Sequence, residues 1–190
     1  MLRLFIAIPL PTRVQRRLAE ESDRLRLAGA PVRWVGPENL HITLRFLGEV
    51  AEAELLGLID ILKDVVPGVG GLELVARGLG AYPSLSRPRV VWCGVTGRDE
   101  EELEELQDLY RRLDRELGKA GFRRDRRSFA PHVTLGRVRG TRNLDGLIER
   151  LGPSLRREFA HFSVKEIVLF ESHQGRQGSV YTPVQTVSLA

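Results

Sequence analysis

A segment of strict alternation in the first third of the chain constrains the fold more than any other feature. Apolar and polar side chains alternate from Leu40 to Phe46, which is the pattern of a β-strand with one buried and one open face. The open face is expected to carry His41, Thr43 and Arg45 in a row, with successive side chains roughly 6.5–7 Å apart. The buried face is expected to consist of Leu40, Ile42, Leu44 and Phe46.

The same His-x-Thr-Leu frame returns at His132 and Thr134 in the second half of the chain. Because four His and seven Thr occur in 190 residues, two such matches in strand-like settings favour a shared role over two solvent-facing strands. We predict two motif strands, at residues 40–47 and 131–138. Helices and strands interleave without a linker, so we expect residues 1–190 to form a single α+β domain of two related lobes, whose motif strands face one central cleft.

The remaining elements follow from hydrophobic periodicity and from the positions of Gly and Pro. The segment from Gly80 to Pro88 is expected to be a loop that carries Tyr82, and a hairpin turn is expected at 175–178. Helices are expected at 11–28, 52–66, 99–117 and 143–151. Further strands are expected at 2–8, 33–35, 72–79, 89–95, 156–161, 164–171 and 180–189.

Composition narrows the class of partner. Arg outnumbers Lys by 26 to 3 and the pI is about 9.7, which favours a phosphate-bearing or nucleic-acid partner, with codon usage and thermal adaptation as alternatives. The single cysteine, Cys93, excludes an internal disulfide. The chain has no run of 18 apolar residues and its apolar N-terminus is too short for a secretory signal, so we expect a cytoplasmic protein without a membrane partner. The lack of an exposed heptad pattern favours a monomer.

The paired His and Thr residues suit chemistry at phosphorus. Two imidazoles on opposite sides of one substrate can act as base and acid in the same step, because an unperturbed imidazole titrates near pH 6.5. Two hydroxyls between them can donate hydrogen bonds to the anionic oxygens of an in-line displacement. Metal-binding patterns such as Cys-x-x-Cys and His-Glu-x-x-His are absent from the sequence, as are a phosphate-binding Gly loop and a Gly-x-Ser-x-Gly elbow. We therefore expect no metal and no other cofactor.

The tetrads HITL and HVTL resemble the signature of the 2H phosphoesterases. The segments LRLFIAIPLP, PENLHITLRFLGEV, RPRVVW and APHVTLGRV extend the likeness over essentially the whole chain. They are similar to the branch of RNA 2′,3′-cyclic phosphodiesterases, also called 2′-5′ RNA ligases (LigT/ThpR-like). The resemblance implies a bilobal α+β fold with pseudo-twofold-related lobes, antiparallel sheets lining the cleft and helices outside. It also implies metal-independent hydrolysis of a terminal 2′,3′-cyclic phosphate on RNA to a 2′-phosphate.

The resemblance also assigns roles to the four motif residues. His41 would donate a proton to the leaving 3′ oxygen, and His132 would accept a proton from the attacking water. Thr43 and Thr134 would hold the phosphate oxygens. The implied partner is RNA with a 2′,3′-cyclic phosphate terminus, with tRNA fragments or small nucleotides among the substrates that fit.

Three further residues are expected to bind substrate. Arg45 would add positive charge on the open face of the first motif strand, unless it is a solvated strand residue. Arg137 ends the second motif, where the family tends to place a basic residue; strict alternation turns it away from the cleft, and a bulge at Gly136 would return it. Tyr82 stands where the family usually has an aromatic residue that stacks on a base, with packing under a Pro-rich loop as the alternative.

Several alternatives stay open. Within the basic run 123–127, Arg124, Arg126 and Arg127 either steer RNA or form a solvated loop. His161 and His173 lack a Thr partner and are expected to be structural or surface residues. The same fold also suits a phosphodiesterase for small cyclic or 2′-5′-linked nucleotides, or a 2′-5′ RNA ligase, because ligation reverses transesterification at a cyclic phosphate. A different class is an RNA-end-binding module without catalysis, which has no need of two titratable groups.

Overall fold

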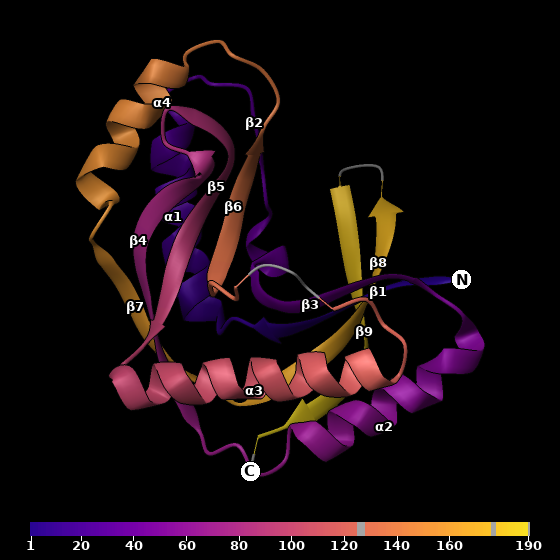
Figure 1. Cartoon of the computed structure of the whole chain (residues 1–190). Coiled ribbons are helices and arrows are strands. Elements are labelled where there is room, and N and C mark those ends of the chain that lie inside the picture. The colour runs from indigo at the N-terminus through magenta and orange to yellow at the C-terminus, as the bar shows by residue number, and fades with distance from the viewer. Residues whose placement is uncertain (125–127, 176–177, 190) are drawn as a thin grey trace.

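The computed structural model describes residues 1–124, 128–175 and 178–189. Within these residues a curled antiparallel sheet of nine strands runs in the order β7-β4-β5-β6-β3-β1-β8-β9, with β2 paired to β6 (Figure 1). The strands are β1 (Leu2–Pro9), β2 (Val32–Trp34), β3 (His41–Val50), β4 (Leu72–Ser84), β5 (Arg87–Gly97), β6 (His132–Val138), β7 (Glu158–Val164), β8 (Glu166–Gly175) and β9 (Gly178–Ser188).

Amphipathic helices pack against this sheet (Figure 1). In the described residues they are α1 (Thr12–Arg26), α2 (Leu55–Val65), α3 (Glu100–Lys119) and α4 (Leu144–Leu151). Helix α1 packs against β6, β7 and α4, whereas α3 packs against β4, β5 and α2. Short 3₁₀ turns lie at Pro37–Asn39, Glu52–Glu54 and Gly152–Ser154. The expected α+β class, with helices outside antiparallel strands, is confirmed.

Among the described residues, no helix combines the length and the apolar character that crossing a membrane requires.

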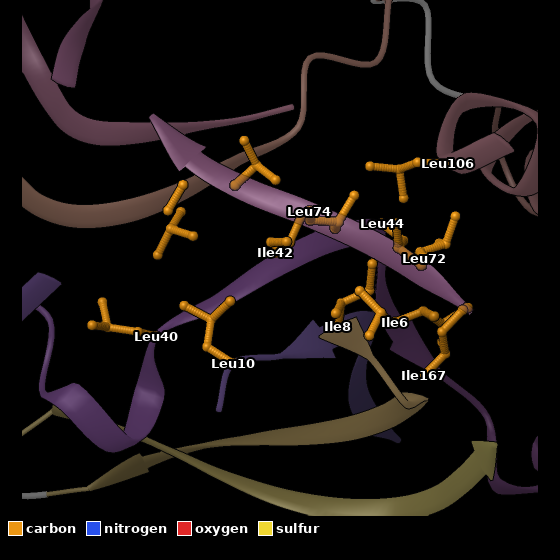
Figure 2. Close-up of a cluster of buried hydrophobic side chains, with 14 of the residues drawn as sticks. Ile6, Ile8, Leu10, Leu40, Ile42, Leu44, Leu72, Leu74, Leu106 and Ile167 are labelled. Carbon is orange, nitrogen blue, oxygen red and sulfur yellow. The ribbon is translucent and has the colours of Figure 1, made fainter. Parts of the chain in front are cut away.

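The hydrophobic core lies on one face of the two motif strands, β3 and β6. Ile42, Leu44, Val133 and Leu135 are at most 4 % exposed and belong to the same buried cluster. Figure 2 shows side chains of β1, β3 and β4 converging there with residues of α3 and β8. Burial of one Leu or Ile side chain stabilises a fold by about 1.5–3 kcal/mol. The core therefore determines which face of each motif strand is left for His and Thr.

The two motif strands are neighbours at the middle of the sheet. Four strands lie in order on the β6 side of this contact (β7-β4-β5-β6) and four on the β3 side (β3-β1-β8-β9). In the described residues β3 and β6 share a single pair of opposed residues, Ile42 and Val133. Such a short ladder fixes the strands at one point only, so other contacts must help to set the spacing between the two motifs.

The loop expected from Gly80 to Pro88 is wrong, because β4 and β5 continue through it as a hairpin. Tyr82 is paired with Val90, so it lies on a strand rather than in a loop. Pro83 and Pro88, which favour a loop in the sequence, lie opposite each other where the strand register shifts. An irregular position of this kind tolerates residues that have no N–H to donate.

Candidate active site

Each motif strand contains a β-bulge at the Leu that ends its His-x-Thr-Leu tetrad. In β3 the register with β1 shifts between Thr43 and Arg45, and in β6 the register with β5 shifts between Thr134 and Gly136. A bulge inserts one unpaired residue and reverses the alternation that follows it. The fifth residue after each His, which is Phe46 in β3 and Arg137 in β6, therefore returns to the strand face that carries the His.

The predicted alternation of the first motif is wrong beyond Thr43. Arg45, expected on the open face, is 5 % exposed and forms an ion pair with Asp114 of α3 at 3.1 Å. Phe46, expected in the core, is 53 % exposed and packs against the Arg3 guanidinium, 5.2 Å from its ring centroid. The bulge explains both errors, because it turns Arg45 inward and Phe46 outward.

Arg137 lies on the same face as Thr134. Strict alternation points it away from the cleft, but the register shift at Leu135 re-aims it, and its side chain is exposed. Its directly opposed neighbour on β2 is Arg33, which is also exposed. Like charges directly opposite one another on adjacent strands are destabilising. The pair therefore forms a surface that favours an anion.

The two motif histidines have matching hydrogen bonds. The Nδ1–H of His41 donates to the carbonyl of Asn39 at 2.7 Å, and that of His132 donates to the carbonyl of Ala130 at 2.8 Å. In both cases the acceptor is two residues earlier in the chain. Because Nδ1 keeps its hydrogen, the neutral form of each ring carries its lone pair on Nε2. Each Nε2 is thus the atom that can take up or release a proton.

The first motif also contains a contact between its own side chains. His41 Nε2 lies 3.1 Å from Thr43 Oγ1. The hydroxyl donates to Nε2 when the imidazole is neutral and accepts from it when the imidazole is protonated. A proton on His41 and a hydrogen bond from Thr43 to another acceptor are therefore compatible, which suits a site that receives an anionic group.

The pKa of His41 is lowered from its ordinary value of 6.5. Burial is the main cause, because it disfavours the charged ring; the hydrogen bond to Asn39 acts in the opposite direction. A charge on His132 lowers the pKa of His41 further. The two imidazoles are therefore close enough for the charge of one to affect the other.

Aromatic side chains surround both histidines. Phe5 and Tyr181 lie 5.0 and 5.3 Å from His41 between ring centroids. The ring of Tyr82 contacts that of His132 edge-on, with 5.3 Å between the centroids, and its centroid lies 5.1 Å from that of Trp92. The structure thus brings the predicted Tyr82 next to His132, with 38 % of the residue exposed. Phe5 and Tyr181 were missed because they come from β1 and β9, which are distant from the motifs in sequence.

Other candidates lie away from this set or outside the described residues. Arg124 forms an ion pair with Asp114 at 2.9 Å, while Arg126 and Arg127 lie outside the described residues, as do residues 176 and 177 of the predicted turn. His161 and His173 are exposed and lie beside Glu158 and Glu171, respectively. In the described part of the chain, no group of three or more His, Cys, Asp or Glu side chains is placed to hold a metal ion.

The amino-acid sequence matches the family described as LigT like Phosphoesterase over residues 8–92 and 98–181. It is 37 % identical over 187 residues to a Methanothermobacter thermautotrophicus protein named RNA 2′,3′-cyclic phosphodiesterase, a match that covers 98 % of both chains. An Aeropyrum pernix protein of the same name is 39 % identical over 174 residues, covering 92 % of this chain and 96 % of its own.

Solved structures share the fold. The crystal structure of E. coli LigT complexed with 3′-AMP superimposes with a TM-score of 0.77 at 26 % identity, covering 99 % of this chain and 98 % of the other. A crystal structure of a Thermus thermophilus protein gives a TM-score of 0.77 at 25 % identity, covering 98 % of this chain and 97 % of the other. The curled antiparallel sheet and its helices are therefore common to these proteins.

Proposed function

The chain belongs to the LigT-like phosphoesterase family, and from this premise we propose that it is an RNA 2′,3′-cyclic phosphodiesterase that opens the cyclic phosphate to a 2′-phosphate. The observation that carries the proposal is the matched pair of histidines. Each imidazole holds Nδ1–H on a main-chain carbonyl and keeps Nε2 for proton transfer. Each also belongs to a strand that presents a Thr hydroxyl two residues later. A binding site for RNA ends needs no such pair of titratable rings.

The reaction balances with these four residues alone. His132 Nε2 accepts a proton from water as the water oxygen bonds to phosphorus. The bond between phosphorus and the 3′ oxygen breaks on the opposite side, and His41 Nε2 gives its proton to that oxygen. Thr43 and Thr134 donate hydrogen bonds to the non-bridging oxygens, where charge accumulates. The products are a 2′-phosphate and a free 3′ hydroxyl, with the two histidines in exchanged protonation states that solvent resets.

Side chains on the same face supply contacts for the rest of the RNA. Arg137 and Arg33 face each other across β6 and β2, and phosphates between them would offset their repulsion. Tyr82 and Phe46 are exposed aromatic rings beside the second and first motif, respectively. Exposed aromatic rings stack on unpaired bases in single-stranded RNA recognition. Contacts of these side chains with neighbouring phosphates and bases would favour RNA over a small cyclic nucleotide.

The lowered pKa of His41 predicts a specific pH dependence. In the free enzyme the proton donor is lost at a lower pH than an ordinary imidazole would allow, so kcat/KM is expected to start falling below about pH 6.5 as pH rises. Bound phosphate carries negative charge and favours the protonated ring, so kcat is expected to hold to higher pH. Rate profiles from about pH 4.5 to about pH 9 bracket the ordinary imidazole pKa and measure both limbs. If the high-pH limbs of kcat/KM and kcat coincided, His41 would not be a proton donor whose charge the bound substrate stabilises.

The proposal is tested by product analysis with phosphorus NMR. A short RNA ending in a 2′,3′-cyclic phosphate is expected to give a 2′-phosphate, at the same rate with and without EDTA. The matched 2′,3′-cyclic mononucleotide, run in parallel, is expected to react with a higher KM, because it lacks the contacts at Arg33, Arg137 and the exposed rings. A 3′-phosphate product would exchange the leaving oxygen and refute the assignment of His41. Absence of turnover on both substrates would refute the proposed function.

A further inference from the structure

Arg45 is a buried cation that the reaction described above does not use. Its side chain is 6 % exposed and lies two residues past Thr43 on the first motif strand. Arg45 Nε lies 3.1 Å from Asp114 Oδ1, but no described acceptor receives a hydrogen bond from this Nε–H. The contact is thus an ion pair, and Arg45 makes its hydrogen bond elsewhere. A buried charge costs several kcal/mol unless it is paired, so the location is a costly one.

The hydrogen bond of Arg45 leads toward the second motif. Arg45 Nη2 donates to the main-chain carbonyl of Arg123, just after α3. Asp114, the ion-pair partner of Arg45, also accepts from Arg124 Nε at 2.9 Å. Arg45 and Asp114 together therefore hold Arg123 and Arg124, which follow α3.

Helix α3 also contacts the residues that lie just before His132. Tyr110, one turn before Asp114, stacks on Phe129 with ring centroids 4.3 Å apart and planes 4° apart. Ala130 follows Phe129 directly, and its carbonyl accepts the hydrogen bond that orients His132. Arg124 and Phe129 thus both contact one helix, and that helix is joined to β3 through the ion pair of Arg45 with Asp114.

We propose that Arg45 is a positioning residue that sets His132 relative to His41: its ion pair joins β3 to α3, and α3 in turn contacts Arg124 and Phe129, which precede His132 in the chain. This inference rests on the proposed roles of the two histidines. The tie adds to the pairing of β2 with β6, because β3 and β6 themselves share one pair of opposed residues in the described structure and their ladder leaves the angle between them weakly determined. A displacement of about 1 Å in a catalytic group can cost about 10²-fold in rate.

The test compares Arg45→Met, which keeps an unbranched apolar stem without the charged guanidinium, with Arg45→Lys. Arg45→Met is expected to lower kcat about 10–100-fold with KM within about twofold, because Arg45 does not touch the substrate. Arg45→Lys is expected to recover part of kcat, since an ammonium group pairs with Asp114 but lacks the planar fork that also reaches the Arg123 carbonyl. Arg98→Met is the matched control, because Arg98 is an exposed, ion-paired arginine at 58 % exposure.

A second readout does not depend on turnover. Imidazole NMR signals of His132 are expected to move in Arg45→Met, with those of His161 unchanged, and Phe129→Leu is expected to move the His132 signals without breaking the ion pair. A folded Arg45→Met protein with parental kcat and parental His132 signals overturns the inference. So does a loss confined to KM, which would place Arg45 against the substrate. If Arg45→Met does not fold, Arg45→Lys and Phe129→Leu decide by the same criteria. Failure of the proposed function would instead leave the parent inactive, with the NMR comparison still able to support or refute the tie.

Discussion

Replacement of His41 or His132 by alanine is expected to lower kcat by about 10²–10⁴-fold, with affinity for the RNA end changed by less than about threefold. General acid–base catalysis at one atom is worth this much, and alanine removes the Nε2 that transfers the proton. The double variant is expected to be little slower than the slower single variant, because residues that act in one step are not additive. Binding survives because Thr43, Thr134 and the exposed arginines remain.

Single-turnover kinetics and RNA binding, measured on the same protein samples, separate the two effects. His161→Ala is the matched control, since His161 is an exposed imidazole beside Glu158 and is expected to be dispensable. Retention of more than about a tenth of the parental rate by His41→Ala would rule out the paired mechanism. An RNA-end-binding module would behave differently again, since its parent protein would show no turnover to lose.

The alternating pattern was enough to predict the strand face on which four of the candidate site residues lie. Four residues precede the bulges: His41, Thr43, His132 and Thr134. Alternation alone places each of them on the strand face that does not carry core residues such as Ile42 or Val133. Their direction follows from local sequence, because their apolar neighbours must be buried in the core and the side chains between them then face the other way. The core of β3 and β6 could be predicted for the same reason.

Residues past the bulges could not be predicted in this way. A bulge is set by the register with a partner strand, β1 for Arg45 and Phe46 and β5 for Arg137, and that register is not visible in the motif itself. A polar residue such as Arg45 between two apolar ones looks identical whether it faces solvent or an acidic partner on α3. Asp114 offered no sign either, because it lies on a helix with many other acidic residues.

The aromatic surroundings of the two histidines also depend on segments that are distant in the sequence. Tyr82 reaches His132 because β4 and β5 form a long hairpin. The sequence does not indicate this hairpin, because Pro83 and Pro88 favour a loop. Phe5 reaches His41 through a neighbouring strand that is buried on both faces, so the alternation of β1 does not reveal its open side. The aromatic part of the candidate site therefore comes from contacts between segments that are distant in the sequence.

Removal of the Asp114 carboxylate is expected to destabilise the protein by about 3–5 kcal/mol, because Asp114→Ala leaves the Arg45 charge buried and without its partner. The loss of the Arg124 contact contributes little to this change in unfolding free energy, since the Arg124 side chain is 68 % exposed and can be solvated by water. The matched control on the same helix is Asp108→Ala. Asp108 pairs with Arg111 at 2.7 Å, but both side chains are more than half exposed, so the loss is expected to be about 0.2–1 kcal/mol.

Urea unfolding at neutral pH, followed by circular dichroism, gives the free energy of unfolding of each variant and its dependence on denaturant. Similar losses in Asp114→Ala and Asp108→Ala would show that the buried pair carries no special weight. The double variant Arg45→Met with Asp114→Leu then separates stability from positioning. Replacing both members of a buried ion pair by apolar residues is often neutral or stabilising, so its unfolding free energy is expected to return close to that of the parent. Its kcat is expected to stay low, because apolar packing restores the core but not the hydrogen bond from Arg45 to the Arg123 carbonyl that leads to His132.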